Sequence, residues 1–132
     1  MHILVVDDDH FSLLAMARPL RQAGYEVVEA MRAEQVLNEA EHGEYKVVIM
    51  DIFMPGMGGI QAIQRIRAAS PECKIVAVSA GMGTMPAEDV IRAAKKVGAD
   101  TGFAKPIQIE ELMAFVQSVG LPPESDIPKN PG

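Results

Sequence analysis

The sequence predicts an α/β protein in which five parallel strands form a doubly wound sheet with helices on both faces. Two observations lead to this fold class. Short apolar runs rich in β-branched residues alternate with longer segments whose apolar residues recur every three or four positions. The short runs are continuous instead of alternating in polarity, which is typical of strands that are covered on both faces. This order of elements indicates a parallel sheet between two helical layers.

The strands are the clearest elements of the pattern. We expect them at Ile3–Val6, Tyr25–Glu29, Val47–Met50, Lys74–Val78 and Gly102–Ala104. The last strand is the weakest of the five, because glycine and alanine have little strand propensity. It is nevertheless kept in the prediction, since it lies between two helical segments in the same way as the others.

Five helical segments separate and follow the strands. Their apolar positions are Phe11, Leu14, Ala15 and Leu20; Val36, Leu37 and Ala40; Ile60, Ile63 and Ile66; Val90, Ile91, Ala94 and Val97; and Ile109, Leu112, Met113 and Val116. Each pattern stops at a glycine or, in the third segment, at Ser70-Pro71, where helices commonly end. Pro19 lies within the first segment and is expected to kink that helix, because proline has no N–H to donate.

The length and composition bound the class of protein. A chain of 132 residues suits one domain, which we expect to cover residues 1–120. Residues 121–132 contain four of the nine prolines and are expected to form a disordered C-terminal tail. Twelve basic against 18 acidic residues give a net charge of −6, which argues against binding to nucleic acid or to an anionic membrane.

The single cysteine, Cys73, excludes an internal disulfide framework and a cysteine-ligated zinc site. No apolar run approaches the roughly 20 residues of a transmembrane helix, and the N-terminus enters a strand without a signal peptide. We therefore expect a cytoplasmic protein with no membrane contact.

Chemically active side chains follow four of the five expected strands. Asp7 and Asp8 follow the first strand, Asp51 the third, Ser79 the fourth and Lys105 the fifth. The carboxyl ends of the strands of a parallel α/β sheet lie at one edge, where such proteins place their functional groups. Each residue taken alone is more often an ordinary loop residue, but their occurrence together at four strand ends favours a site.

The chemistry of this set is that of phosphoryl transfer. Carboxylates held close together repel one another, so the pKa of at least one should rise unless a cation intervenes. Mg²⁺ suits such a site because it prefers oxygen ligands. A carboxylate beside Mg²⁺ and a lysine is poised to attack a phosphoryl group and form an acyl phosphate. Asp9 is expected to cap the following helix instead.

Four motifs occur together in this chain: Ile3-Leu4-Val5-Val6-Asp7-Asp8, Asp51-Ile52-Phe53-Met54-Pro55, Val78-Ser79-Ala80 and Lys105-Pro106. With them, residues 1–120 resemble the CheY-like receiver domain of two-component response regulators. The resemblance implies a flavodoxin-like fold with strand order 2-1-3-4-5. It also implies a stand-alone phosphorylation substrate, with no output domain in this chain and no enzymatic activity beyond its own phosphotransfer and dephosphorylation.

The resemblance implies a role for each matching residue. Asp51 accepts a phosphoryl group from a histidine kinase or a histidine phosphotransfer protein. Asp8, Asp51 and the backbone carbonyl of Phe53 hold Mg²⁺, and Asp7 acts on the ion through water. Ser79 follows the phosphoryl group and moves the loop after the fourth strand.

Lys105 pairs with Asp51 or with the phosphoryl oxygens. The changes reach the loop after the fourth strand and the face of the fifth strand, and so control binding to a downstream target protein.

The chain departs from the common family pattern in the fifth strand and after the Met-Pro turn. Receivers commonly carry an aromatic residue three positions before the lysine, and this chain has Gly102 there with Phe103 one step later. Because neighbouring side chains on a strand point to opposite faces, Phe103 is expected to be a core residue and not a substitute. The other departure is Gly58-Gly59 after the Met-Pro turn, where receivers usually have Asp-Gly. It is expected to change the entry to the third helix and not the site chemistry.

Two other functions are compatible with parts of the pattern. A phosphatase of the haloacid-dehalogenase type has Asp-x-Asp after its first strand, which Asp7 and Asp9 match, but Phe11 stands where threonine or valine is usual and the role of Asp51 is then unexplained. A receiver that binds partners without being phosphorylated is favoured by Gly102 and disfavoured by the intact acidic set. Flavin binding is disfavoured because no phosphate-binding loop follows the first strand.

Overall fold

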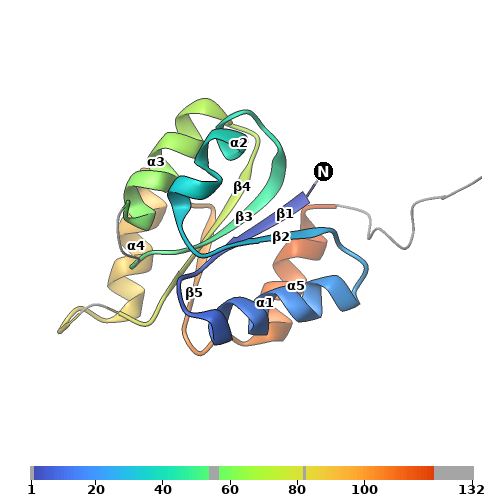
Figure 1. Cartoon of the computed structure of the whole chain (residues 1–132). Coiled ribbons are helices and arrows are strands. Elements are labelled where there is room, and N and C mark those ends of the chain that lie inside the picture. The colour runs from blue at the N-terminus through green and yellow to red at the C-terminus, as the bar shows by residue number, and fades with distance from the viewer. Residues whose placement is uncertain (1, 54–56, 82, 121–132) are drawn as a thin grey trace, which may run out of the picture.

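The computed structural model describes residues 2–53, 57–81 and 83–120, and the expected tail at 121–132 lies outside this part of the chain. The described residues form a five-stranded parallel sheet in the order β2-β1-β3-β4-β5. The predicted fold class and strand order are therefore confirmed. In Figure 1, α2 and α3 lie on one side of the sheet, and α1 and α5 lie on the other.

Strands and helices alternate along the chain. They are β1 (His2–Val6), α1 (His10–Gln22), β2 (Val27–Ala30), the 3₁₀ helix η1 (Ala33–Gln35), α2 (Leu37–Glu41), β3 (Tyr45–Asp51), α3 (Gly59–Ala69), β4 (Lys74–Ser79), α4 (Ala87–Val97), β5 (Thr101–Ala104) and α5 (Ile109–Ser118). No helix in the described ranges is long and apolar enough to cross a membrane.

The sheet divides the core into two apolar layers, as the continuous apolar strands predict. Along β1, Leu4 and Val6 face α2, α3 and α4, whereas Ile3 and Val5 face α1 and α5. The same two-residue alternation holds in β3 and β4, whose apolar side chains are almost all fully buried. Because both faces are covered, polar groups can gather only at the sheet's ends, and the carboxyl ends carry the candidate site.

The face of α1 that packs on the sheet differs in part from the expected one. Leu20 is buried as expected, but its buried partners are Leu13, Met16 and Ala17, whereas Phe11 is 83% exposed. The expected set and the observed set both recur at helical spacing, so periodicity alone left two faces of the helix open. The helix runs on through Pro19 to Gln22, where it ends one turn after the proline.

The second helical segment is the least regular. A single helix was expected around Val36–Ala40, but the chain forms a 3₁₀ turn and then a five-residue helix. The break falls at Val36, whose backbone is not helical, with φ −128° and ψ 0°. Val36 and Leu37 are nevertheless buried against the sheet, so this segment is shaped by packing and not by helix propensity.

Candidate phosphoryl-transfer site

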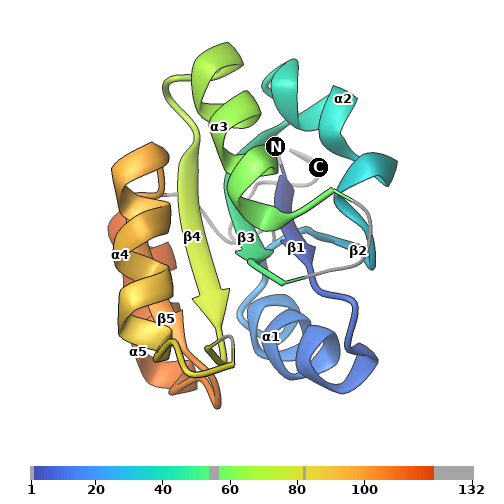
Figure 2. The same ribbon diagram turned by 90° about the vertical axis from the view of Figure 1, so that its left-hand side faces the viewer.

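The sheet brings the predicted site residues to one edge. Asp51 is the last residue of β3 and lies beside Val78, and Ser79 is the last residue of β4 and lies beside Ala104. In Figure 2, the arrowheads of β1, β3 and β4 point to this edge. Each side chain sits where it does because a buried apolar strand ends immediately before it or with it.

A lysine ammonium joins two of the carboxylates. Lys105 Nζ lies 2.8 Å from Asp7 Oδ2 and 3.6 Å from Asp51 Oδ2. Asp7 is fully buried and Asp51 is 6% exposed, whereas Asp8 is exposed. One carboxylate oxygen from each of the three aspartates lies within 4.8 Å of the others. The structure therefore brings Asp7, Asp8, Asp51 and Lys105 together, as expected from their positions at the ends of the strands.

The electrostatics of the cluster are unbalanced. Burial and the neighbouring Asp7 carboxylate raise the pKa of Asp51 from 3.8 to about 7, although Lys105 and a hydrogen bond from the Phe53 backbone act in the opposite direction. Three carboxylates face one ammonium, so the site carries excess negative charge when all are ionised. The rise in pKa agrees in direction with the repulsion expected from the sequence. A further cation would balance the excess negative charge.

Lys105 responds to the same imbalance. Burial lowers its pKa, but the hydrogen bond to Asp7 and the charge of Asp51 outweigh this and raise the pKa above its usual value of 10.5. Its backbone N–H donates to the carbonyl of Ser79 at 2.8 Å, which positions the lysine at the end of β4. The raised pKa keeps its side chain charged at neutral pH.

Ser79 is fully buried at the end of β4. Its hydroxyl oxygen accepts a hydrogen bond of 2.9 Å from the N–H of Gly81, two residues further along the chain. A hydroxyl that accepts one hydrogen bond can still donate another. Ser79 directly follows Val78, the strand neighbour of Asp51.

Asp9 has a different role from Asp7 and Asp8. Its carboxylate accepts from the N–H of Phe11 at 3.1 Å and from the hydroxyl of Ser12 at 3.1 Å, so it caps α1 as expected. An aspartate held in this way points into the helix start. The Asp-x-Asp pattern of Asp7 and Asp9 therefore does not form a pair of facing carboxylates.

Sequence reasoning missed one residue that shapes the site. A Cβ atom on Gly59 would lie 2.6 Å from the carbonyl oxygen of Asp51 and 2.6 Å from the Cα of Ile52. The N–H of Gly59 donates to the carbonyl of Ile52 at 2.9 Å. The first residue of α3 thus touches the backbone of the candidate phosphoacceptor, and only glycine fits. The glycine pair was a visible signal, but nothing in the sequence told the two glycines apart.

The fold and the acidic edge define a class of protein, a doubly wound α/β domain with a carboxylate and lysine site at the ends of its strands. The model of the response regulator receiver domain matches residues 3–117. This chain belongs to that family, and the resemblance inferred from its motifs is confirmed. Receiver domains are the phosphoacceptor modules of two-component systems. Their phosphoryl donors are sensor histidine kinases or phosphotransfer proteins.

Several relatives are similar along nearly the whole described chain. The sporulation initiation phosphotransferase F of Bacillus subtilis is 29% identical over 115 residues, which cover 87% of this chain and 90% of that protein. A CheY-like receiver structure from Methanospirillum hungatei has a TM-score of 0.77 at 26% identity and covers 89% of this chain and 90% of that one. CheY4 of Vibrio cholerae has a TM-score of 0.75 at 27% identity, with 89% and 97% covered.

Other relatives are much longer than the matching region. A cyclic di-GMP phosphodiesterase of Thermotoga maritima is 31% identical over 112 residues, which cover 85% of this chain but 29% of that protein. The regulatory protein RpfC of Xanthomonas campestris is 32% identical over 117 residues, 16% of its length. The chain thus spans less than a third of the length of each of these two relatives. The activities in their names are not assigned to this chain.

The residues present fit a magnesium ion, which receiver domains bind at an acidic pocket. The donor set consists of carboxylate oxygens only, which hard divalent cations prefer, and one of the three carboxylates is exposed to water. The raised pKa of Asp51 is a second sign of fit, because a cation there would offset the burial and the Asp7 charge that disfavour its ionised form. Among the described residues, this is the one group of three or more such side chains close enough to share an ion.

Proposed function

We propose that this chain is a phosphoacceptor receiver whose Asp51 takes a phosphoryl group from the phosphohistidine of a histidine kinase or a phosphotransfer protein. The observation that supports this most directly is the Lys105 ammonium placed between Asp7 and Asp51, at 2.8 Å and 3.6 Å. Its positive charge would lie next to a phosphoryl group attached to Asp51.

The reaction follows from the chemistry of the groups. A carboxylate oxygen of Asp51 attacks phosphorus, the O–P bond forms, and the P–N bond to the donor imidazole breaks. The imidazole nitrogen leaves with the electron pair and takes up a proton. Asp51 must be ionised to attack, and the charge of Lys105 favours that form.

Mg²⁺, when bound, neutralises charge on the transferring phosphoryl group. Asp8, Asp51 and the backbone carbonyl of Phe53 are the residues that we propose to hold it, and Asp7 acts through water. The burial of Asp7 and its short contact with Lys105 support an indirect role, because this carboxylate already has a cationic partner.

Phosphorylation changes the balance of charge at four strand ends at once. In our proposal the hydroxyl of Ser79 turns to donate to a phosphoryl oxygen, Lys105 pairs with another oxygen, and the loop from β4 to α4 and the β5 face change with them. A downstream target protein reads this face. We place the protein in the cytoplasm, where its kinase partner acts, and propose no direct contact with nucleic acid or membrane.

The phosphatase alternative has little support in the geometry. It requires Asp7 and Asp9 to act as a pair, and Asp9 is bound to the first turn of α1. The alternative of a receiver that only binds a partner leaves the crowding of three carboxylates without a function. The phosphoacceptor role accounts for the whole cluster.

The deciding experiment is the intact mass of the protein after incubation with acetyl phosphate and Mg²⁺. Wild type is compared with Asp51→Asn and with Asp9→Asn, a matched control that removes a carboxylate two residues from Asp7. We expect one added phosphoryl group on wild type and on Asp9→Asn, and none on Asp51→Asn.

Two results would contradict the proposal. An adduct that persists in Asp51→Asn places the acceptor elsewhere. Absence of any adduct, together with no change in the amide spectrum on addition of beryllofluoride and Mg²⁺, shows that the site does not accept a phosphoryl group.

A further inference from the structure

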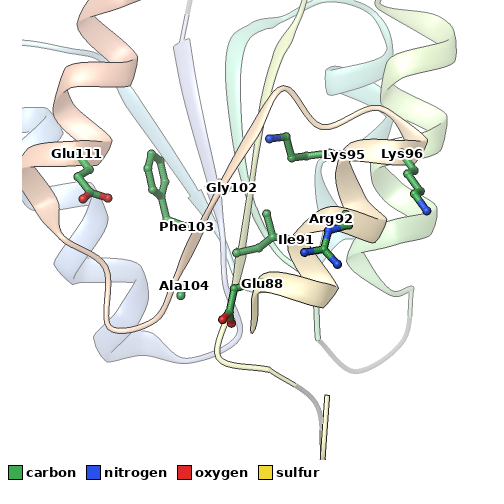
Figure 3. A pocket seen from close by; sticks show the side chains of 9 residues that line it. All are labelled: Glu88, Ile91, Arg92, Lys95, Lys96, Gly102, Phe103, Ala104 and Glu111. Carbon is green, nitrogen blue, oxygen red and sulfur yellow. The ribbon is translucent and has the colours of Figure 1, made fainter. Parts of the chain in front are cut away.

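The strand β5 has an unusual contact at Gly102. A Cβ atom on this glycine would lie 2.4 Å from Cγ2 and 3.1 Å from Cγ1 of Ile91, and 3.0 Å from the carbonyl oxygen of Ala77. The side chain of Ile91 therefore occupies the volume that any other residue at position 102 would need. Figure 3 shows Ile91 extending from α4 toward the β5 ribbon, with Phe103 on the other side of that ribbon.

Phe103 does not take over the missing side chain. It packs with the apolar layer between the sheet and α1 and α5, as the strand alternation predicted. Gly102 faces α4 on the opposite side. On the face toward α4, Gly102 therefore has no side chain that could rotate when the site changes. The side chain of Ile91 from α4 fills the space over Gly102 instead.

The start of α4 is in turn connected to the candidate site. The N–H of Gly81 donates to the hydroxyl oxygen of Ser79 at 2.9 Å. Gly81 has φ +96°, and a Cβ there would lie 2.8 Å from the carbonyl of Met85 and 3.3 Å from the N–H nitrogen of Ala87. The residue bonded to Ser79 is therefore packed directly against the backbone that opens α4, with no side chain between them.

We propose that Ile91 transmits the state of the site to the β5 face by moving with α4 over Gly102. The proposal rests on the phosphoacceptor function, because it requires the Ser79 hydroxyl to turn toward a group on Asp51. When the Ser79 side chain rotates and its Oγ moves toward that group, the Gly81 N–H loses its acceptor, the close packing against the backbone of Met85 and Ala87 relaxes, and α4 shifts. Ile91 then leaves its place over Gly102, and signalling proceeds by displacement of a helix and not by rotation of a strand side chain.

This movement has a defined consequence on the surface. Ile91, Gly102 and Phe103 line a groove of about 590 Å³ between α4, β5 and α5 (Figure 3). Lys95 and Lys96 on α4 and Glu111 on α5 stand around it. Because Ile91 forms the apolar wall next to the glycine, its displacement changes the shape of this groove while the charged rim remains.

The first test compares amide spectra of the full chain with and without beryllofluoride and Mg²⁺. Wild type should show shifts at residues 79–81 and 105, in α4 and at residues 101–104. In Ile91→Ala, the shifts at 79–81 and 105 should persist, whereas those at 101–104 should fall by about half or more, since the contact that carries them is gone. Val97→Ala, which shortens another partly buried side chain of α4, is the matched control and should respond as wild type does.

A second variant tests the same contact in the opposite sense. Gly102→Ala places a methyl group where Ile91 lies, so without beryllofluoride the α4 amides should already be displaced toward their positions in loaded wild type. The double variant Gly102→Ala/Ile91→Ala removes the clash and should return them. A thermal unfolding curve confirms that each variant is folded, and if Gly102→Ala does not fold, the Ile91→Ala comparison decides alone.

The outcomes separate this inference from the proposed function. Shifts at 79–81 and 105 with unchanged shifts at 101–104 in Ile91→Ala would overturn the role of Ile91 and leave the phosphoacceptor function intact. A wild-type spectrum that does not respond at residues 79–81 and 105 would contradict the proposed function itself. Reduced shifts in Val97→Ala equal to those in Ile91→Ala would also overturn the inference, because the effect would then belong to α4 as a whole.

Discussion

Two clusters of charged residues lie at opposite ends of the sheet, and they differ in how completely their charges are matched. At the amino ends of β4 and β5, Arg67 donates to the carbonyls of Gly98, Pro71 and Cys73 and to the Asp100 carboxylate, at 2.6–2.9 Å. Asp100 also accepts from the N–H of Ile75 at 2.8 Å. One guanidinium faces one carboxylate, and each group is hydrogen-bonded.

At the carboxyl ends, three carboxylates share one ammonium, and the pKa of Asp51 is raised to about 7. The comparison shows how a structural cluster differs from a chemical one. In the Arg67 cluster every charged group has a hydrogen-bonded partner, and the cluster connects several segments of the chain. The Asp51 cluster is left with excess negative charge that a cation can neutralise. Mutations should therefore change the two clusters in different directions.

The largest expected effect is on the Arg67 cluster. Arg67→Ala should lower the free energy of unfolding by about 3 kcal/mol, because it leaves three backbone carbonyls without the Arg67 donor and removes the cationic partner of Asp100. Chemical denaturation measures this value. The response of residues 79–81 to beryllofluoride should be kept in the folded protein, and its loss would show that the two clusters are not independent.

An intermediate effect is expected where the Asp51 cluster meets the backbone of α3. Gly59→Ala should lower the free energy of unfolding by about 2 kcal/mol, since its Cβ would overlap the backbone of Asp51 and Ile52. Gly58→Ser is the matched control, because a Cβ at Gly58 meets nothing within 4 Å, and its effect should stay within about 0.5 kcal/mol. Equal effects of the two substitutions in denaturation curves would contradict this difference.

The last effect concerns the charge of the Asp51 cluster and has the opposite sign. In the presence of a chelator, Asp51→Asn should raise the free energy of unfolding at pH 8, where the wild-type carboxyl is ionised in both the folded and the unfolded state. The carboxyl ionises near pH 3.8 when unfolded and near pH 7 when folded, so between these values the folded state holds a proton that the unfolded state has lost. The wild type therefore loses stability as pH rises from about 4 to 7.

The gain in Asp51→Asn should grow over the same pH range and then remain level, and it should shrink when Mg²⁺ is added to the wild type. Denaturation curves at several pH values measure it. A gain that does not depend on pH would show that burial and the neighbouring carboxylates do not raise the pKa of Asp51.

The sequence by itself determined the five strands, their parallel arrangement and the members of the acidic site. Continuous β-branched runs can be buried only between two layers, and residues that follow such runs must then meet at one edge. Asp7, Asp51, Ser79 and Lys105 were predicted for this reason, and the cap formed by Asp9 followed from local hydrogen bonding.

Only the tertiary structure decided which face of α1 is buried, why Gly59 cannot carry a side chain, and what fills the place over Gly102. Leu13 and Met16 pack inward while Phe11 is exposed, although both sets fit the helical period. A side chain at Gly59 is excluded by the backbone of Asp51, and a side chain at Gly102 is excluded by the side chain of Ile91. Such contacts depend on how elements approach one another in space, and a glycine in the sequence does not reveal which neighbour excludes its side chain.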